Sequence, residues 1–69
     1  MSNNSFLEAL MSHYESEAKS RLATLELYLN EPMAVADHTS LFEDMKKLTE
    51  ELAEAEDALA TLRRHFPVN

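Results

Sequence analysis

The chain has 69 residues, with no Gly, Cys or Trp, and its 13 acidic residues outnumber six Lys and Arg to give a net charge of -7. This length excludes more than one domain, and so short a domain buries only ~60% of the surface of its unfolded chain. The lack of Cys excludes disulfide frameworks and thiolate sites, and the acidic balance disfavours nucleic-acid phosphates, whose binding requires cations.

The sequence also predicts a soluble protein. Residues 1–8 have neither the basic start nor the long apolar stretch of a signal peptide. The longest apolar clusters, such as Leu27-Tyr28-Leu29, are far shorter than the ~20 residues that span a bilayer. Because the absence of Cys is typical of a reducing compartment, we expect a cytoplasmic location.

The first predicted element is a helix over about residues 6–30. Ser5 followed three residues later by Glu8 is typical of a capping box, in which the two side chains satisfy free backbone N–H groups at a helix start. Pro32 predicts the end of this helix because a proline disfavours helical geometry in the residue before it. The connection that follows, about residues 31–39, lacks Gly and carries two apolar residues, Met33 and Val35.

The second predicted element is a helix over about residues 41–66. Ser40 and Glu43 repeat the capping-box pattern, and Pro67 ends the run. Three basic residues precede that proline, where cations interact favourably with the negative end of the helix dipole: Arg63, Arg64 and His65. Two helices of matched length predict one all-α domain over residues 1–69, an antiparallel, coiled-coil-like two-helix hairpin.

Both helices carry apolar residues at the spacing of a heptad seam. In the second helix the seam has alternating steps of four and three: Leu41, Met45, Leu48, Leu52, Ala55, Leu59, Leu62 and Phe66. In the first helix the pattern starts in the same way but takes two consecutive steps of four around Ala18: Leu7, Met11, Tyr14, Ala18, Leu22, Leu25 and Leu29. Such a stutter predicts that the seam shifts around the first helix at Ala18.

Several large apolar side chains lie outside these seams, and a lone hairpin would leave them in water because each helix has one neighbour. Burying one such side chain is worth about 1.5–3 kcal/mol. We therefore expect the hairpin to complete a four-helix bundle as a homodimer or to dock on a helical partner. The predicted partner-binding residues are Phe6, Leu10, Leu27, Tyr28, Met33 and Phe42.

The sequence predicts no enzyme, cofactor or metal site. A chain without Gly has no glycine-rich phosphate loop and no nucleophile elbow. His13, His38 and His65 have no second His three or four residues away, and structural zinc takes four ligands. The acidic run over residues 50–57 is interrupted by Leu52 and Ala55, so its carboxylates spread around the helix instead of converging on one ion.

The second helix and the segment before it resemble the YscE/SsaE-like co-chaperones of type III secretion. The resemblance rests on Asp37-His38, on the run Ala55-Glu56-Asp57-Ala58-Leu59, and on Leu62-Arg63-Arg64-His65-Phe66. It implies a two-helix cytoplasmic adaptor that pairs with a tetratricopeptide-like chaperone and keeps a needle subunit from polymerising before export.

The size, acidity and hairpin topology are also similar to those of the Rop-type regulators. That resemblance implies a dimeric four-helix bundle that binds RNA loops through basic and polar groups on one helix face. The first helix offers Lys19 and Arg21 for this role, against several glutamates. The RNA-binding regulator is therefore the alternative to the co-chaperone.

Overall fold

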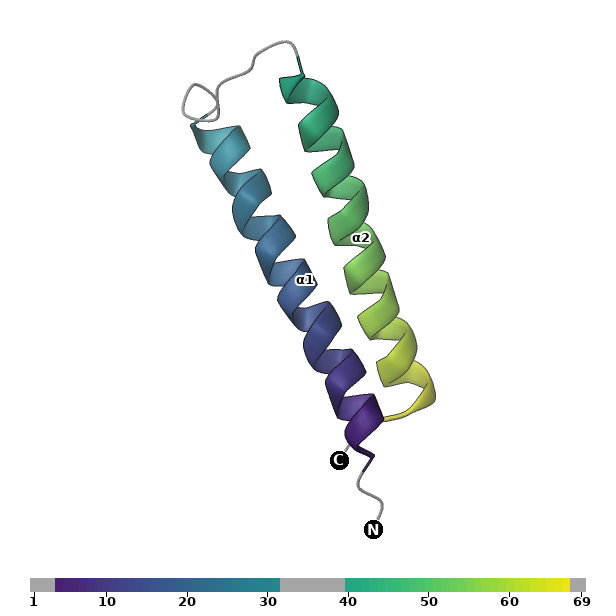
Figure 1. Ribbon diagram of the computed structural model, residues 1–69. Coiled ribbons are helices and arrows are strands. Elements are labelled where there is room, and N and C mark those ends of the chain that lie inside the picture. Colours follow the sequence, from purple (N-terminus) through teal and green to yellow (C-terminus); the bar gives the residue numbers. More distant parts are fainter. Residues whose placement is uncertain (1–3, 32–39, 68–69) are drawn as a thin grey trace.

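The computed structural model describes residues 4–31 and 40–67 and shows two helices that run antiparallel, side by side. Helix α1 spans Ser5–Asn30 and helix α2 spans Leu41–His65, each within one residue of its predicted range. The start of α1 lies beside the end of α2 (Figure 1). The predicted all-α hairpin is confirmed.

The helix ends follow the sequence in position but not in every capping contact. Asn4, not Ser5, is the N-cap of α1, and its side-chain Oδ1 accepts a hydrogen bond from the backbone N–H of Leu7 at 3.1 Å. Ser40 is the N-cap of α2 as predicted, but its hydroxyl makes no capping bond within the described part of the chain. The capping-box prediction was therefore wrong at both starts, because the amide of Asn4 takes the role expected of Ser5 and the hydroxyl of Ser40 makes no such bond in the described residues.

Both helices end where their backbone leaves helical geometry just before a proline in the sequence. The N–H of Glu31 donates to the carbonyl of Leu27, and the N–H of Phe66 donates to the carbonyl of Leu62, each at 2.8 Å. The last turn of α2 holds the three basic residues that the sequence placed there. The positive charges of Arg63 and Arg64 interact favourably with the partial negative charge of the unpaired carbonyls.

The seam of α2 lies against α1 as predicted, with one exception. Ala55 and Leu59 are the buried residues of the described chain, 3% and 7% exposed. The other members from Leu41 to Leu62 are half-buried. Phe66 is largely exposed because the helix has already ended at His65.

The seam of α1 differs from its prediction. The half-buried positions continue from Ala18 with an unbroken three-four rhythm through Arg21, Leu25 and Tyr28. Leu22 and Leu29 lie beside this seam and are exposed. The predicted stutter was therefore wrong, because Arg21 and Tyr28 can bury their stems in the seam while their polar tips reach water.

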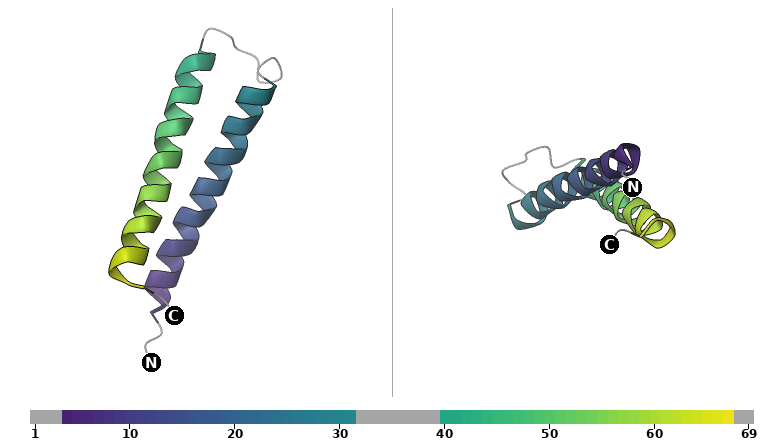
Figure 2. Two further views of the ribbon diagram at one scale, coloured as in Figure 1. Left: turned by 180° about the vertical axis from the view of Figure 1, so that it is seen from behind. Right: turned by 90° about the horizontal axis from the view of Figure 1, so that it is seen from below.

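The hairpin is a single layer, which limits how much it can bury. Figure 2 shows the two helices from behind and along their length, with no third element covering either face in the described residues. The Cα atoms extend over 52 × 16 × 16 Å. Each side chain can therefore contact at most one neighbouring helix, and large apolar groups away from the seam remain in contact with solvent.

Candidate partner-binding surface

Exposed apolar side chains gather in two patches at opposite ends of the hairpin. The terminal patch is formed where α1 starts and α2 ends, and consists of Phe6, Leu7, Leu10, Leu62 and Phe66. The loop-end patch is an open groove of about 390 Å³ where α1 ends and α2 starts, with Leu25, Leu29, Phe42 and Met45 along it. Its polar border is Lys46, Thr49 and Glu50.

The predicted partner-binding residues divide between these patches. Phe6 and Leu10 lie in the terminal patch, and Phe6 is 84% exposed. Phe42, 71% exposed, lies in the loop-end patch. Met33 lies outside the described residues.

Leu27 and Tyr28 do not join the loop-end patch. Residues two apart on a helix are about 200° apart, so Leu27 lies on the opposite side of α1 from Leu29. Leu27 is exposed, whereas Tyr28 is half-buried in the seam. The described members of the predicted partner-binding set therefore lie on different sides of the hairpin.

Three large apolar side chains that were predicted to lie in the seams are exposed in the structure: Leu22, Leu29 and Phe66. Leu29 is 62% exposed and lines the loop-end patch. Heptad steps counted without a break from Leu7 place Arg21 and Tyr28 in the seam, and they would have predicted that Leu22 and Leu29 lie outside it. The exposure of Phe66 could have been predicted from Pro67, because a proline ends the helix before it.

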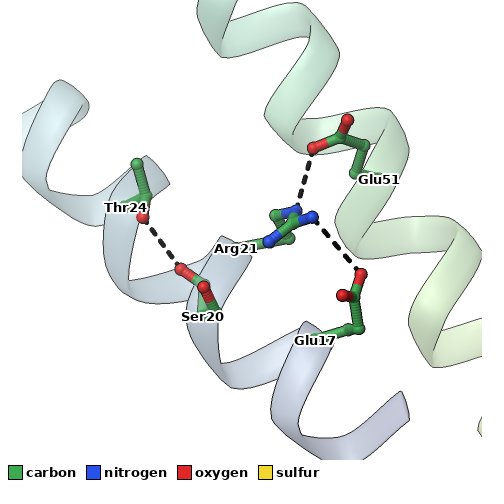
Figure 3. A network of polar contacts seen from close by, with 5 residues as sticks. All are labelled: Glu17, Ser20, Arg21, Thr24 and Glu51. Atoms are coloured by element: carbon green, nitrogen blue, oxygen red, sulfur yellow. Dashed lines mark hydrogen bonds and ion pairs between the residues drawn. The ribbon is translucent and has the colours of Figure 1, made fainter. Parts of the chain in front are cut away.

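The middle of one face is held by a network around Arg21 (Figure 3). Its Nε donates to Oε1 of Glu51 on α2 at 2.9 Å, and its Nη2 lies 3.3 Å from Oε1 of Glu17, one turn earlier in α1. Nearby, the hydroxyl of Thr24 donates to the carbonyl of Ser20. The guanidinium is therefore already engaged by two carboxylates, and its charge is compensated.

A second ion pair joins the helices on the opposite face. Nη2 of Arg63 lies 3.1 Å from Oε2 of Glu15, with both side chains about half exposed. Exposed pairs of this kind contribute about 0–1 kcal/mol, because water screens them and the side chains lose freedom. This pair joins the ends of the two helices through long side chains and adds little to the stability of the hairpin.

The phenol of Tyr28 contacts a carboxylate on the other helix. Its hydroxyl lies 3.4 Å from Oδ2 of Asp44 on α2. Partial desolvation of the phenol raises its pKa above the usual 10.0, and the charge and hydrogen bond of Asp44 add to this effect because both disfavour a phenolate. Tyr28 is therefore a neutral hydrogen-bond donor near neutral pH.

Within residues 4–31 and 40–67, no group of three or more His, Asp or Glu side chains is arranged to hold a metal ion. Neither described helix has an apolar stretch that would let it cross a bilayer. Comparison with protein-family models, curated proteins and solved structures found no match for this chain.

Proposed function

We propose that this protein is a helical interaction module that completes its core by binding other helices. The observation that supports this proposal is the imbalance of burial: the described residues bury Ala55 and Leu59 while seven large apolar side chains are exposed. Those seven are Phe6, Leu10, Leu22, Leu27, Leu29, Phe42 and Phe66. Apolar patches with polar borders are typical of protein-protein binding sites.

The specific form we propose is the cytoplasmic co-chaperone implied by the resemblance to the YscE/SsaE-like proteins. An adaptor of this kind would bind a tetratricopeptide-like chaperone, whose helical repeats offer apolar surfaces to a helix. The terminal patch suits such an occupant because Phe6 and Phe66 supply large aromatic groups, and aromatic residues are enriched at the energetic centres of interfaces. The partner would thus cover the patch that the hairpin leaves open.

The charge arrangement weakens the RNA-binding alternative. Arg21 and Arg63 are both paired with glutamates, and Lys19 lies beside Glu15 and Glu56. A phosphate strand would have to displace those carboxylates, against a net charge of -7. No face of the described hairpin carries an uncompensated basic stripe.

The test is capture of a stoichiometric partner by a tagged chain in its native cells. We expect one helical protein to co-purify, with little loss between low and moderate salt. The double variant Phe6→Glu and Leu10→Glu should lose that protein, because it places charges in the terminal patch. Ser16→Glu is the control, since Ser16 is exposed on α1 and belongs to neither patch.

Two results would contradict the proposal. Equal capture by wild type and by the Phe6→Glu and Leu10→Glu variant would remove the terminal patch from consideration. Retardation of a structured RNA, with an affinity that falls steeply as salt rises, would favour the Rop-like regulator instead.

A further inference from the structure

The loop-end patch belongs to a longer face of the hairpin that changes character along its length. Heptad steps keep side chains on one side of a helix in a coiled coil. On α1 such steps connect Glu8, Glu15, Leu22 and Leu29, and on α2 they connect Phe42, Thr49, Glu56 and Arg63. We call these eight residues the flank face. It is apolar near the loop and charged near the termini.

The register between the helices fixes which of these residues lie level. Arg21 contacts Glu51, and Tyr28 contacts Asp44, so seven residues forward along α1 correspond to seven residues back along α2. Leu29 and Phe42 share the loop-end groove, and one heptad away Leu22 is level with Thr49. Near the termini, Glu15 and Arg63 form their ion pair.

We infer that the flank face binds a second copy of this chain, with the two hairpins side by side and their loops at the same end. A two-fold axis along the hairpin would place α1 of one copy against α2 of the other at equal height. Leu29 would then meet Phe42 of the second copy, and Glu15 would meet Arg63 of the second copy. Apolar groups meet apolar groups near the loop, and near the termini the carboxylate of Glu15 meets the guanidinium of Arg63.

The reverse orientation, with loops at opposite ends, would match the face badly. Leu29 and Phe42 of one copy would lie against Glu15, Glu56 and Arg63 of the other. Charged groups would lose water without gaining a partner, which disfavours that arrangement. The distribution of charge along the flank face therefore selects one of the two ways to build a four-helix bundle.

The opposite face of the hairpin is a poorer surface for a second copy. Its middle is lined by Glu17, Glu51 and Glu54 around Arg21. Two such faces would bring like charges together, whereas the charged half of the flank face holds Lys19 and Arg63 beside Glu15 and Glu56. Self-association through the flank face thus adds less repulsion than the opposite face would to a dimer of charge -14, twice the -7 of one chain.

The shape of the hairpin leaves room for a dimer interface. Its Cα atoms extend over 52 × 16 × 16 Å, so one long side of the rod is available to a second copy. A standard interface buries roughly 800 Å² of each partner. This inference rests on the proposed function, that the exposed apolar groups bind helices, and it leaves the terminal patch for a different protein.

The first test is the mass of the pure protein by sedimentation equilibrium. We expect wild type at twice the 7.9 kDa chain mass, and Leu29→Glu as a monomer with unchanged helix content by circular dichroism. Leu27→Glu is the matched control: it makes the same change two residues away, on the other side of α1, and should remain a dimer. If Leu29→Glu loses helix content, Thr49→Glu introduces the charge at an exposed position of the same face and should give a helical monomer.

The second test measures orientation with a spin label on Asn30→Cys, a unique site because the chain has no Cys. With loops at one end, the two labels should be about 20–25 Å apart, two helix diameters; with loops at opposite ends, about 40 Å or more, the length of α1. The longer distance overturns the inference, as does a monomeric wild type or a Leu29→Glu dimer. Partner capture by monomeric Leu29→Glu reports on the proposed function separately, since that variant keeps the terminal patch.

Discussion

The most direct test of the hairpin core compares two leucine-to-alanine substitutions, at Leu59 and Leu27. Leu59 is 7% exposed in the seam, and Leu27 is 45% exposed on the side of α1 away from the seam. Leu59→Ala removes nearly the whole transfer free energy of its side chain and leaves a space that the opposite helix fills in part. We expect a loss of about 2–3 kcal/mol, the lower part of the range for buried leucines, because one face of the site is open to relax.

Leu27→Ala should cost much less, because about half of its side chain is already in water. Scaling the transfer free energy of a leucine by its buried fraction gives a loss of about 1 kcal/mol. For a chain of 69 residues, the total stability is on the order of 3–10 kcal/mol. The first substitution therefore removes a large part of the stability, and the second a small part.

The assay is urea unfolding followed by circular dichroism, with wild type and both variants at one protein concentration. A lower midpoint with an unchanged slope reports lost stability and not a change in the unfolded state. Equal losses at the two positions would refute the reasoning, since they would mean that Leu27 is as buried as Leu59. That result would place a second buried surface on the side of α1 that the structure leaves exposed.

Three further predictions concern polar contacts. Replacing Asn4 with Ala should cost about 1 kcal/mol of stability by urea unfolding, whereas Ser40→Ala should cost less, because Asn4 caps its helix with a side-chain bond and Ser40 does not; equal losses would contradict this contrast. A double-mutant cycle with Arg21→Gln and Glu51→Gln should give a coupling of about 0.2–1 kcal/mol that shrinks with added salt, and a salt-independent coupling would show that the pair is better shielded than the structure indicates. In a Tyr14→Phe background, where Tyr28 is the remaining tyrosine, ultraviolet titration should give a pKa above 10.0. Because the raised pKa favours the protonated folded state, the stability that Tyr28 contributes is present below about pH 10 and is lost as pH rises through its folded pKa; a pKa below the usual value would contradict this.

The sequence by itself determined the two helices, their ends and their antiparallel pairing. Prolines stop helices because they lack an N–H and restrict the preceding residue, and this is a local effect. The heptad seam of α2 was equally clear, since its apolar residues follow one unbroken rhythm from Leu41 to Leu62. Local helix propensity and the hydropathy pattern agree in these segments, so the sequence alone was sufficient to predict them.

Only the tertiary structure decided which side of α1 faces α2. Around Ala18, hydropathy favoured Leu22 and Leu29, but the packed helix placed Arg21 and Tyr28 in the seam. The reason is that both side chains are apolar along their stems and polar at their tips, and α2 offers Glu51 and Asp44 to those tips. The hydropathy pattern of one helix carries no information about the polar groups that the other helix places opposite it. This choice also exposed Leu22 and Leu29, which form the apolar half of the flank face with Phe42.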